Sequence, residues 1–154
     1  SPHKIRDEYF KPWCDVANNE IDLAKAFQKK GLIKDLVGVF KANLARETEN
    51  LSADDAKELS ADEVATRVKG ISTGQKKEGL GAVMIVESFN KTTNEATVLV
   101  VFFDIATHNV LMSKTVTGKP SGGNAKAAWT GAIKDIFSKI EKKEYATWKK
   151  DAHF

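Results

Sequence analysis

The sequence predicts a single α+β domain over residues 1–154: N-terminal helices, a three-stranded antiparallel meander at about 80–117, and a C-terminal helix at about 124–142. Two observations carry this prediction. Three β-rich runs follow one another between Gly79 and Thr117, separated only by polar breaks at 90–95 and 106–109, and apolar residues recur with a helical period after Asn124. Strands joined by such short connections must be antiparallel, because a parallel return needs a crossover of about a dozen residues or more. The length suits one domain with its own core.

The first elements are predicted to be helical. Pro12 limits any helix over Arg6–Trp13 to a short one. Asn18 and Asn19 are candidate N-caps for a helix over residues 21–27, which Gly31 would end. A strand over 21–27 is the alternative, because apolar and polar residues also alternate there.

A second apolar stripe begins at Leu32 and follows the spacing i, i+4, i+7, i+8 and i+12. It predicts a core-facing helix in which Gly38 allows a close helix contact. The stripe consists of Leu32, Leu36, Val39, Phe40 and Leu44.

The acidic segment Glu47–Lys57 is expected to be a solvated connection or a short helical turn. Ser60 and Glu63 then have the spacing of a capping box, which predicts a helix start, and Gly70 is a natural stop.

The middle run of the meander, Ala96–Ile105, is almost continuously apolar. A strand that is apolar on both faces is usually covered on both. We therefore expect helices to pack on the sheet, since three strands cannot shield it from water alone.

The C-terminal helix has the most regular apolar face, and Asn124 is its expected N-cap. Trp129, Ile133, Ile136 and Phe137 are predicted to be buried against the meander. The tail, Lys142–Phe154, is expected to continue this helix or to fray.

Composition bounds the function without assigning one. The net charge is only +3 with both signs interspersed, which argues against nucleic-acid binding. The single cysteine excludes an intramolecular disulfide, and no apolar run approaches the roughly 18–20 residues of a membrane helix. Ser1-Pro-His-Lys4 is not a signal peptide, because it lacks an apolar region. A secreted origin, with a leader removed ahead of Ser1, stays open.

No catalytic, cofactor or metal site is predicted. Histidines 3, 108 and 153 lack partners at metal-ligand spacing, and His108 is typical of a turn. Cys14 has no base nearby in the sequence. Asp104 and Glu87 at strand ends could converge, although solvated strand ends are more common. We expect Cys14, His108 and Asp104 not to converge with a second catalytic-type residue in one cleft.

The glycine-rich stretch Thr117–Asn124 lies between a strand and a helix, so its amides could hold an anion or a partner at the helix N-terminus. It lacks the phosphate-loop frame, and a plain loop with a helix cap is the more common structure. The residues of this candidate site are Gly118, Lys119, Gly122, Gly123 and Asn124.

Several stretches of the C-terminal half, residues 60–140, resemble small secreted or envelope proteins of Bacteroidetes bacteria that have no established activity. The resemblance lies in GLGAVMIVESFNK (79–91), VVFFDIAT (100–107), Val110-Leu111, GKPSGG (118–123) and Ala128-Trp129. It implies a periplasmic or secreted setting and supplies no catalytic residue.

The resulting expectation is a non-catalytic extracytoplasmic protein that acts through a protein-interaction surface, with no cofactor and with its oligomeric state open. Aromatic residues near both ends look exposed, although packing of the termini against the domain is the simpler explanation. The alternative function is a small-ligand binder with a pocket between the sheet and the helices, which a solvent-connected cavity would favour. The aromatic residues concerned are Tyr9, Phe10, Trp13, Tyr145 and Trp148.

Overall fold

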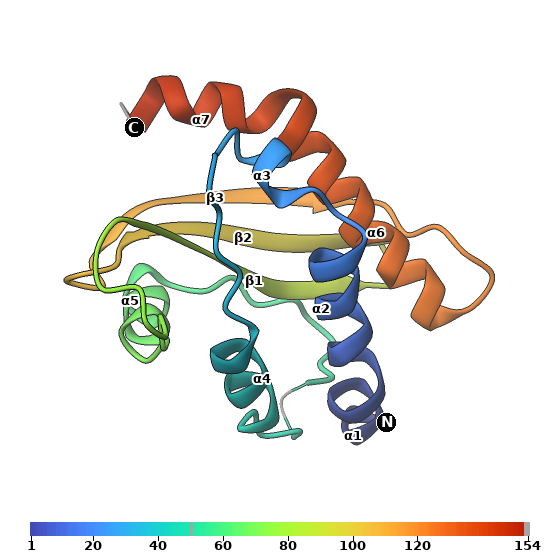
Figure 1. Ribbon diagram of the computed structural model, residues 1–154. Helices are drawn as coiled ribbons and strands as arrows, with labels where there is room; N and C mark the ends of the chain where they lie inside the picture. Colours follow the sequence, from blue (N-terminus) through green and yellow to red (C-terminus); the bar gives the residue numbers. More distant parts are fainter. Residues whose placement is uncertain (50, 153–154) are drawn as a thin grey trace.

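The computed structural model describes residues 1–49 and 51–152, and it confirms the α+β fold (Figure 1). Helices surround a three-stranded sheet, and the C-terminal helical segment packs across it. In chain order the elements are α1 (Pro2–Lys4), η1 (Ile5–Tyr9), α2 (Phe10–Asn19), α3 (Leu23–Ala26), α4 (Leu36–Leu44), α5 (Ala61–Lys69), β1 (Leu80–Asn90), β2 (Glu95–Asp104), β3 (Val110–Gly118), α6 (Ala125–Lys139), η2 (Ile140–Glu144) and α7 (Tyr145–Ala152), where η denotes a π-helical turn.

The sheet is the predicted meander. Its strand order is β1-β2-β3, and both pairs are antiparallel, with Val101 opposite Val83 on one side and Ser113 on the other. The two short polar breaks form the turns. Helices cover both faces of β2, which explains why that strand is apolar throughout.

The larger core lies on the face of the sheet that α6 and α7 cover (Figure 1). Val98, Val100 and Phe102 point toward this side from β2. All four α6 residues that were expected to be buried are buried: Trp129, Ile133, Ile136 and Phe137. Asn124 is the N-cap of α6, as predicted, and accepts a hydrogen bond from Ala127 N (3.0 Å).

The opposite face carries a smaller core under α5. Leu99, Val101 and Phe103 of β2 pack there against Val64 and Val68, which lie four residues apart on the helix. Alternate residues of one strand therefore enter two separate cores.

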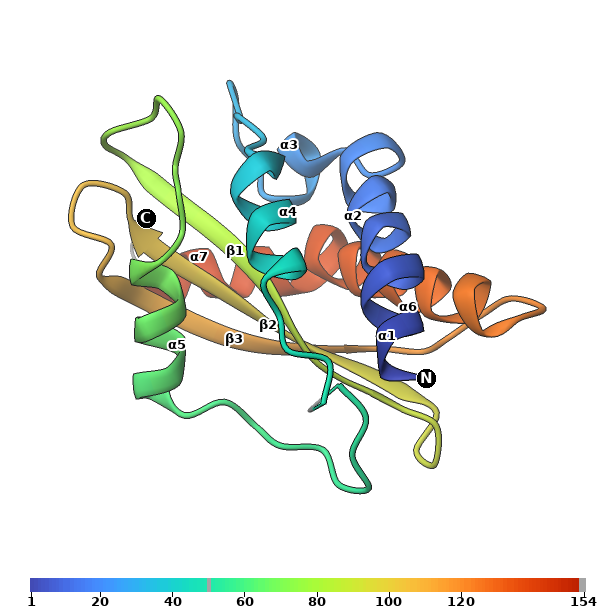
Figure 2. The same ribbon diagram turned by 90° about the horizontal axis from the view of Figure 1, so that it is seen from below.

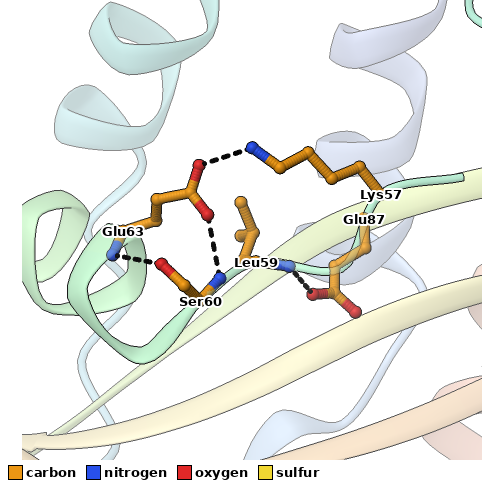
Figure 3. A network of polar contacts seen from close by, with 5 residues as sticks. All are labelled: Lys57, Leu59, Ser60, Glu63 and Glu87. Atoms are coloured by element: carbon orange, nitrogen blue, oxygen red, sulfur yellow. Dashed lines mark hydrogen bonds and ion pairs between the residues drawn. The ribbon is translucent and has the colours of Figure 1, made fainter.

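The predicted capping box starts α5 (Figure 3). Ser60 Oγ accepts from Glu63 N (3.2 Å), while the Glu63 carboxylate accepts from Ser60 N (2.9 Å) and pairs with Lys57 (3.1 Å). Just before this cap, Leu59 N donates to Glu87 of β1 (2.9 Å). The backbone amide of Leu59 thus ties the start of α5 to the sheet.

The C-terminal tail continues the helix through η2 and α7 as far as Ala152. Tyr145 is fully buried and Trp148 is 4% exposed, and both rings contact Phe102. Trp13 near the other end is also buried. These aromatic residues close the core, so packing of the termini, and not exposure, is the correct interpretation.

The first helical segment differs from the prediction, because it runs through Pro12. Pro12 is the third residue of α2, where a missing N–H costs little, and the π-helical turn η1 directly precedes α2. Asn18 and Asn19 end α2 and do not cap the next helix.

The ambiguous segment 21–27 is helical over its centre. Its N-cap is Asp22, whose side chain accepts from Lys25 N (3.0 Å). Gly31 was expected to end this helix, but α3 already ends at Ala26, and Gln28 adopts the left-handed conformation after it (φ +48°).

The helix predicted from Leu32 begins at Leu36, with Asp35 as its N-cap, and it does not face the core. None of its residues is buried. It packs on α2 and η1, and Gly38 lies against the carbonyl group of Ser72 in a loop and not against another helix. The residues with the apolar period do form a helix, but α5, α6 and α7 already cover the faces of the sheet, so α4 packs outside the core.

Candidate functional site

An aromatic pocket lies between the N-terminal helical segment, β1 and the start of α6. Its volume is about 270 Å³. Tyr9 and Trp13 line it from η1 and α2, Phe89 from the end of β1, and Trp129 from α6. Figure 2 shows α2 and α6 side by side.

The four rings form one continuous wall. The ring centroids of Trp13 and Phe89 are 4.3 Å apart, those of Phe89 and Trp129 are 4.8 Å apart, and those of Tyr9 and Trp13 are 6.1 Å apart. All three pairs are tilted or edge-on, as aromatic pairs prefer. The side of the pocket is therefore rigid and apolar.

A β-bulge places Phe89 in this wall. The register of β1 against β2 shifts between Val86 and Ser88, so Glu87 is the extra residue. Without the shift, Phe89 would share a face with Val83 and Ile85, under α5. A one-residue shift moves every later side chain to the other face of the strand, and Phe89 joins the larger core.

The pocket is lined by two serines, Ser1 and Ser52, and its charged side chains are both cationic. Lys4 and Lys91 line it, whereas none of its lining residues is Asp or Glu. Lys4 has a weak ion pair with Glu8 at 3.6 Å, and both side chains are more than half exposed. Lys91 forms no ion pair within residues 1–49 and 51–152. Asn90 fixes the turn that carries Lys91, because its side chain accepts from Thr92 N and Thr93 N.

The indole N–H of Trp13 is a buried donor that has no acceptor among the described residues. Such a group costs free energy, since water bonded to it in the unfolded chain. Its ring lines the pocket, but the N–H itself is shielded from solvent, so the ring contributes an apolar surface to the wall.

A second candidate surface consists of exposed side chains on α4 and in the segment that leads into it. Ile33 is 70% exposed, Val37 64% and Leu44 69%. Lys41 lies between Val37 and Leu44 at helical spacing and has no ion pair in the described part of the chain. We call Ile33, Val37, Lys41 and Leu44 the α4 surface.

In the glycine-rich loop that was predicted as an anion or interaction site, three positions have structural roles. Lys119 N donates to Asp135 Oδ2 of α6 (2.9 Å), so this amide already has a carboxylate of the protein as its acceptor. Gly118 lies directly against the carbonyl group of Ala132 and leaves no room for a side chain. Asn124 caps α6. The role of this loop as an anion or interaction site stays a prediction.

Asn124 also borders a more open hollow of about 380 Å³. Asp15 and Glu20 of the N-terminal segment line the same hollow, and Lys126 lies opposite. Carboxylates at this helix N-terminus make it less suited to an anion.

Of the residues considered for chemistry, Cys14 lies on α2, whereas Asp104 and His108 lie together at the β2–β3 turn. Cys14 is half-buried on α2, accepts a hydrogen bond from Asn43 (3.6 Å), and burial raises the pKa of its thiol. Asp104 and His108 share the β2–β3 turn. Hydrogen bonds from Thr107 lower the pKa of Asp104, while His108 adopts the left-handed conformation expected of a turn residue (φ +58°).

Glu87 and Asp104 do not converge. Asp104 pairs with the first residue of β1, whereas Glu87 lies near its other end and accepts from Leu59 N. Within the described residues no three His, Cys, Asp or Glu side chains come together as metal ligands would. His153 lies outside those residues.

None of the helices in residues 1–49 and 51–152 combines the length and the apolar character needed to cross a bilayer. The sequence matches no protein-family model, and comparison with curated proteins and with solved structures found no match. The resemblance to Bacteroidetes proteins therefore stays a prediction, and the function must be argued from the surfaces themselves.

Proposed function

We propose that this chain is a non-catalytic, extracytoplasmic protein that acts through a protein-interaction surface, and that this surface is the α4 surface. One observation carries the proposal. Six of the nine residues of α4 are apolar (Leu36, Val37, Val39, Phe40, Ala42 and Leu44), yet none of them is buried. An amphipathic helix usually gives its apolar residues to the core, and α4 leaves large ones in water.

The free energy favours covering this surface. Fully burying a Val, Leu or Ile side chain contributes about 1.5–3 kcal/mol. Ile33, Val37 and Leu44 are each about two-thirds exposed. Covering all three would therefore contribute roughly 3–6 kcal/mol before the cost of association.

Charge indicates which partner fits. Residues 29–44 carry four lysines and one aspartate, a net +3, which equals the net charge of the chain. The remainder has 20 basic and 20 acidic residues and is neutral. A partner surface with apolar side chains flanked by carboxylates complements this segment in both respects.

The test is affinity capture from the native source, followed by binding of the purified partner. Val37→Glu with Leu44→Glu places two carboxylates on the α4 surface without disturbing any buried side chain. Leu111→Glu is the matched control, because Leu111 is a 54% exposed apolar residue on β3. We expect one protein to bind the wild type and the control and to lose at least tenfold affinity for the double variant.

Equal binding by the double variant would refute the α4 surface as the interface. Loss of binding by the Leu111 variant alone would place the interface on the sheet. Thermal melts of all three proteins should coincide within about 2 °C, since exposed substitutions change stability little.

The extracytoplasmic setting is supported by the resemblance alone. The test is fractionation of the native cell, with antibodies against the purified protein. The non-catalytic part is supported by the separation of Cys14 from the β2–β3 turn. Purified protein that turned over a substrate, with loss of activity on Cys14→Ser or His108→Ala, would overturn it.

A second candidate function is small-ligand binding, and the aromatic pocket is the observation that favours it. The pocket lies between the sheet and the helices, has rigid walls and is open to solvent. Its test is described below.

A further inference from the structure

The aromatic pocket has a shape and a chemistry that select one class of ligand. Its volume of about 270 Å³ lies just below the range of about 300–1,000 Å³ that is common for ligand sites. A nucleotide or a folded peptide segment is too large for it. One or two fused rings match the space.

The wall favours a planar aromatic group. Trp13, Phe89 and Trp129 form a continuous series in which neighbouring ring centroids are 4.3 and 4.8 Å apart. A ligand ring would extend this series with the tilted or offset geometry that aromatic groups prefer. A flexible aliphatic chain would gain burial but none of this ring packing.

The rim favours one negative charge. Lys4 lines the pocket from α1 and Lys91 from the β1–β2 hairpin, and no carboxylate lines it. The side chain of Asn90 holds the backbone of the hairpin turn, which keeps the Cα atom of Lys91 beside the pocket. Each ammonium group can donate to a carboxylate oxygen, and a site with two cations and no anion disfavours a cationic ligand.

We infer that the pocket binds a small planar aromatic carboxylate, with its ring against Trp13, Phe89 and Trp129 and its carboxylate between Lys4 and Lys91. This inference rests on the second proposed function, that of a small-ligand binder.

The experiment uses four probes on the full chain: naphthalene-2-carboxylate, its neutral carboxamide, 2-naphthylmethylammonium and octanoate. Binding is measured by calorimetry, and its place is read from the three tryptophan indole N–H signals in NMR spectra. Trp13 and Trp129 line the pocket, whereas Trp148 packs on Phe102 elsewhere. Replacement of each Trp in turn by Phe assigns the signals.

We expect the carboxylate to shift the Trp13 and Trp129 signals, to leave that of Trp148 in place, and to bind at least tenfold more tightly than the other three probes. Lys4→Gln with Lys91→Gln should remove the preference for carboxylate over carboxamide. The matched control is Lys142→Gln with Lys143→Gln, which removes the same charge at two exposed lysines after α6. It should keep the preference.

The other outcomes separate the two claims. Binding of no probe refutes the ligand-binding function itself. Equal binding of carboxylate and carboxamide keeps a ligand pocket but overturns its anion selectivity, and equal binding of octanoate overturns its aromatic selectivity. A shift of the Trp148 signal alone shows a different site and also overturns the inference.

Discussion

Replacing Tyr145 by Phe should raise the free energy of unfolding, whereas most substitutions in a core lower it. Its side chain is fully buried, and its hydroxyl has no hydrogen-bond partner among the described residues. A buried polar group left unpaired costs about 1–3 kcal/mol. Phe keeps the ring and its edge-on contact with Phe27 at 5.5 Å, and it removes only the unpaired oxygen.

The expected gain is about 1 kcal/mol, since the small space left by the oxygen offsets part of the benefit. For a domain of this size that corresponds to a rise in Tm of roughly 2–4 °C. Urea melts followed by tryptophan fluorescence measure it, with Tyr145→Ala as the comparison, which should lose about 3–5 kcal/mol. A loss above about 0.5 kcal/mol for Tyr145→Phe would refute the reasoning, because it would show that the hydroxyl has an acceptor.

Three further substitutions test other parts of the fold. Phe137→Ala should cost about 3–5 kcal/mol in urea melts, because the ring is buried against the sheet, and a loss below about 1 kcal/mol would mean that α6 packs elsewhere. Gly118→Ala should cost about 1–3 kcal/mol by overpacking against α6, while Gly123→Ala, with nothing within 4 Å, should be neutral; equal effects would contradict the close approach. The Ser60 amide and then Lys57 lower the pKa of Glu63 from 4.5 to about 2, so its contribution to stability is complete above about pH 4.5 and is lost as the pH falls toward 2. The wild type should therefore lose more stability than Glu63→Gln over that interval, and parallel pH profiles would contradict this.

The parts of the fold that depend on local rules could be predicted from the sequence. Loop length determined the antiparallel meander, and the two-sided apolar character of β2 indicated that both faces are covered. The caps at Ser60 and Asn124 also follow local rules, since each depends on a side chain and an amide within three residues of it. None of these features requires knowledge of the rest of the chain.

The prediction was wrong where one local sequence pattern is compatible with two different places in the folded structure. The apolar period of α4 is the same whether the helix faces a core or is left at the surface, and only the positions of α5, α6 and α7 decide between them. The aromatic residues near the ends show the same ambiguity. Tyr145 and Trp148 stand among lysines in the sequence but contact Phe102 of the sheet, so the simpler of the two interpretations, packing of the termini, is confirmed for them. Pro12 was overvalued as a helix breaker, since the π-helical turn before α2 could not be read from the sequence.

The aromatic pocket was beyond prediction for a more specific reason. The sequence allows a pocket between the sheet and the helices but does not identify the residues that line it. Period-two alternation along β1 assigns Phe89 to the face of Val83 and Ile85, away from the pocket. The bulge at Glu87 reverses that assignment. Glu87 also accepts a hydrogen bond from the Leu59 amide, and this bond fixes the chain leading into α5 on the opposite face. One inserted residue therefore sends Phe89 toward Trp13 and Trp129 and anchors the cover of the smaller core, so the site and the two-sided packing of the sheet have a common structural origin.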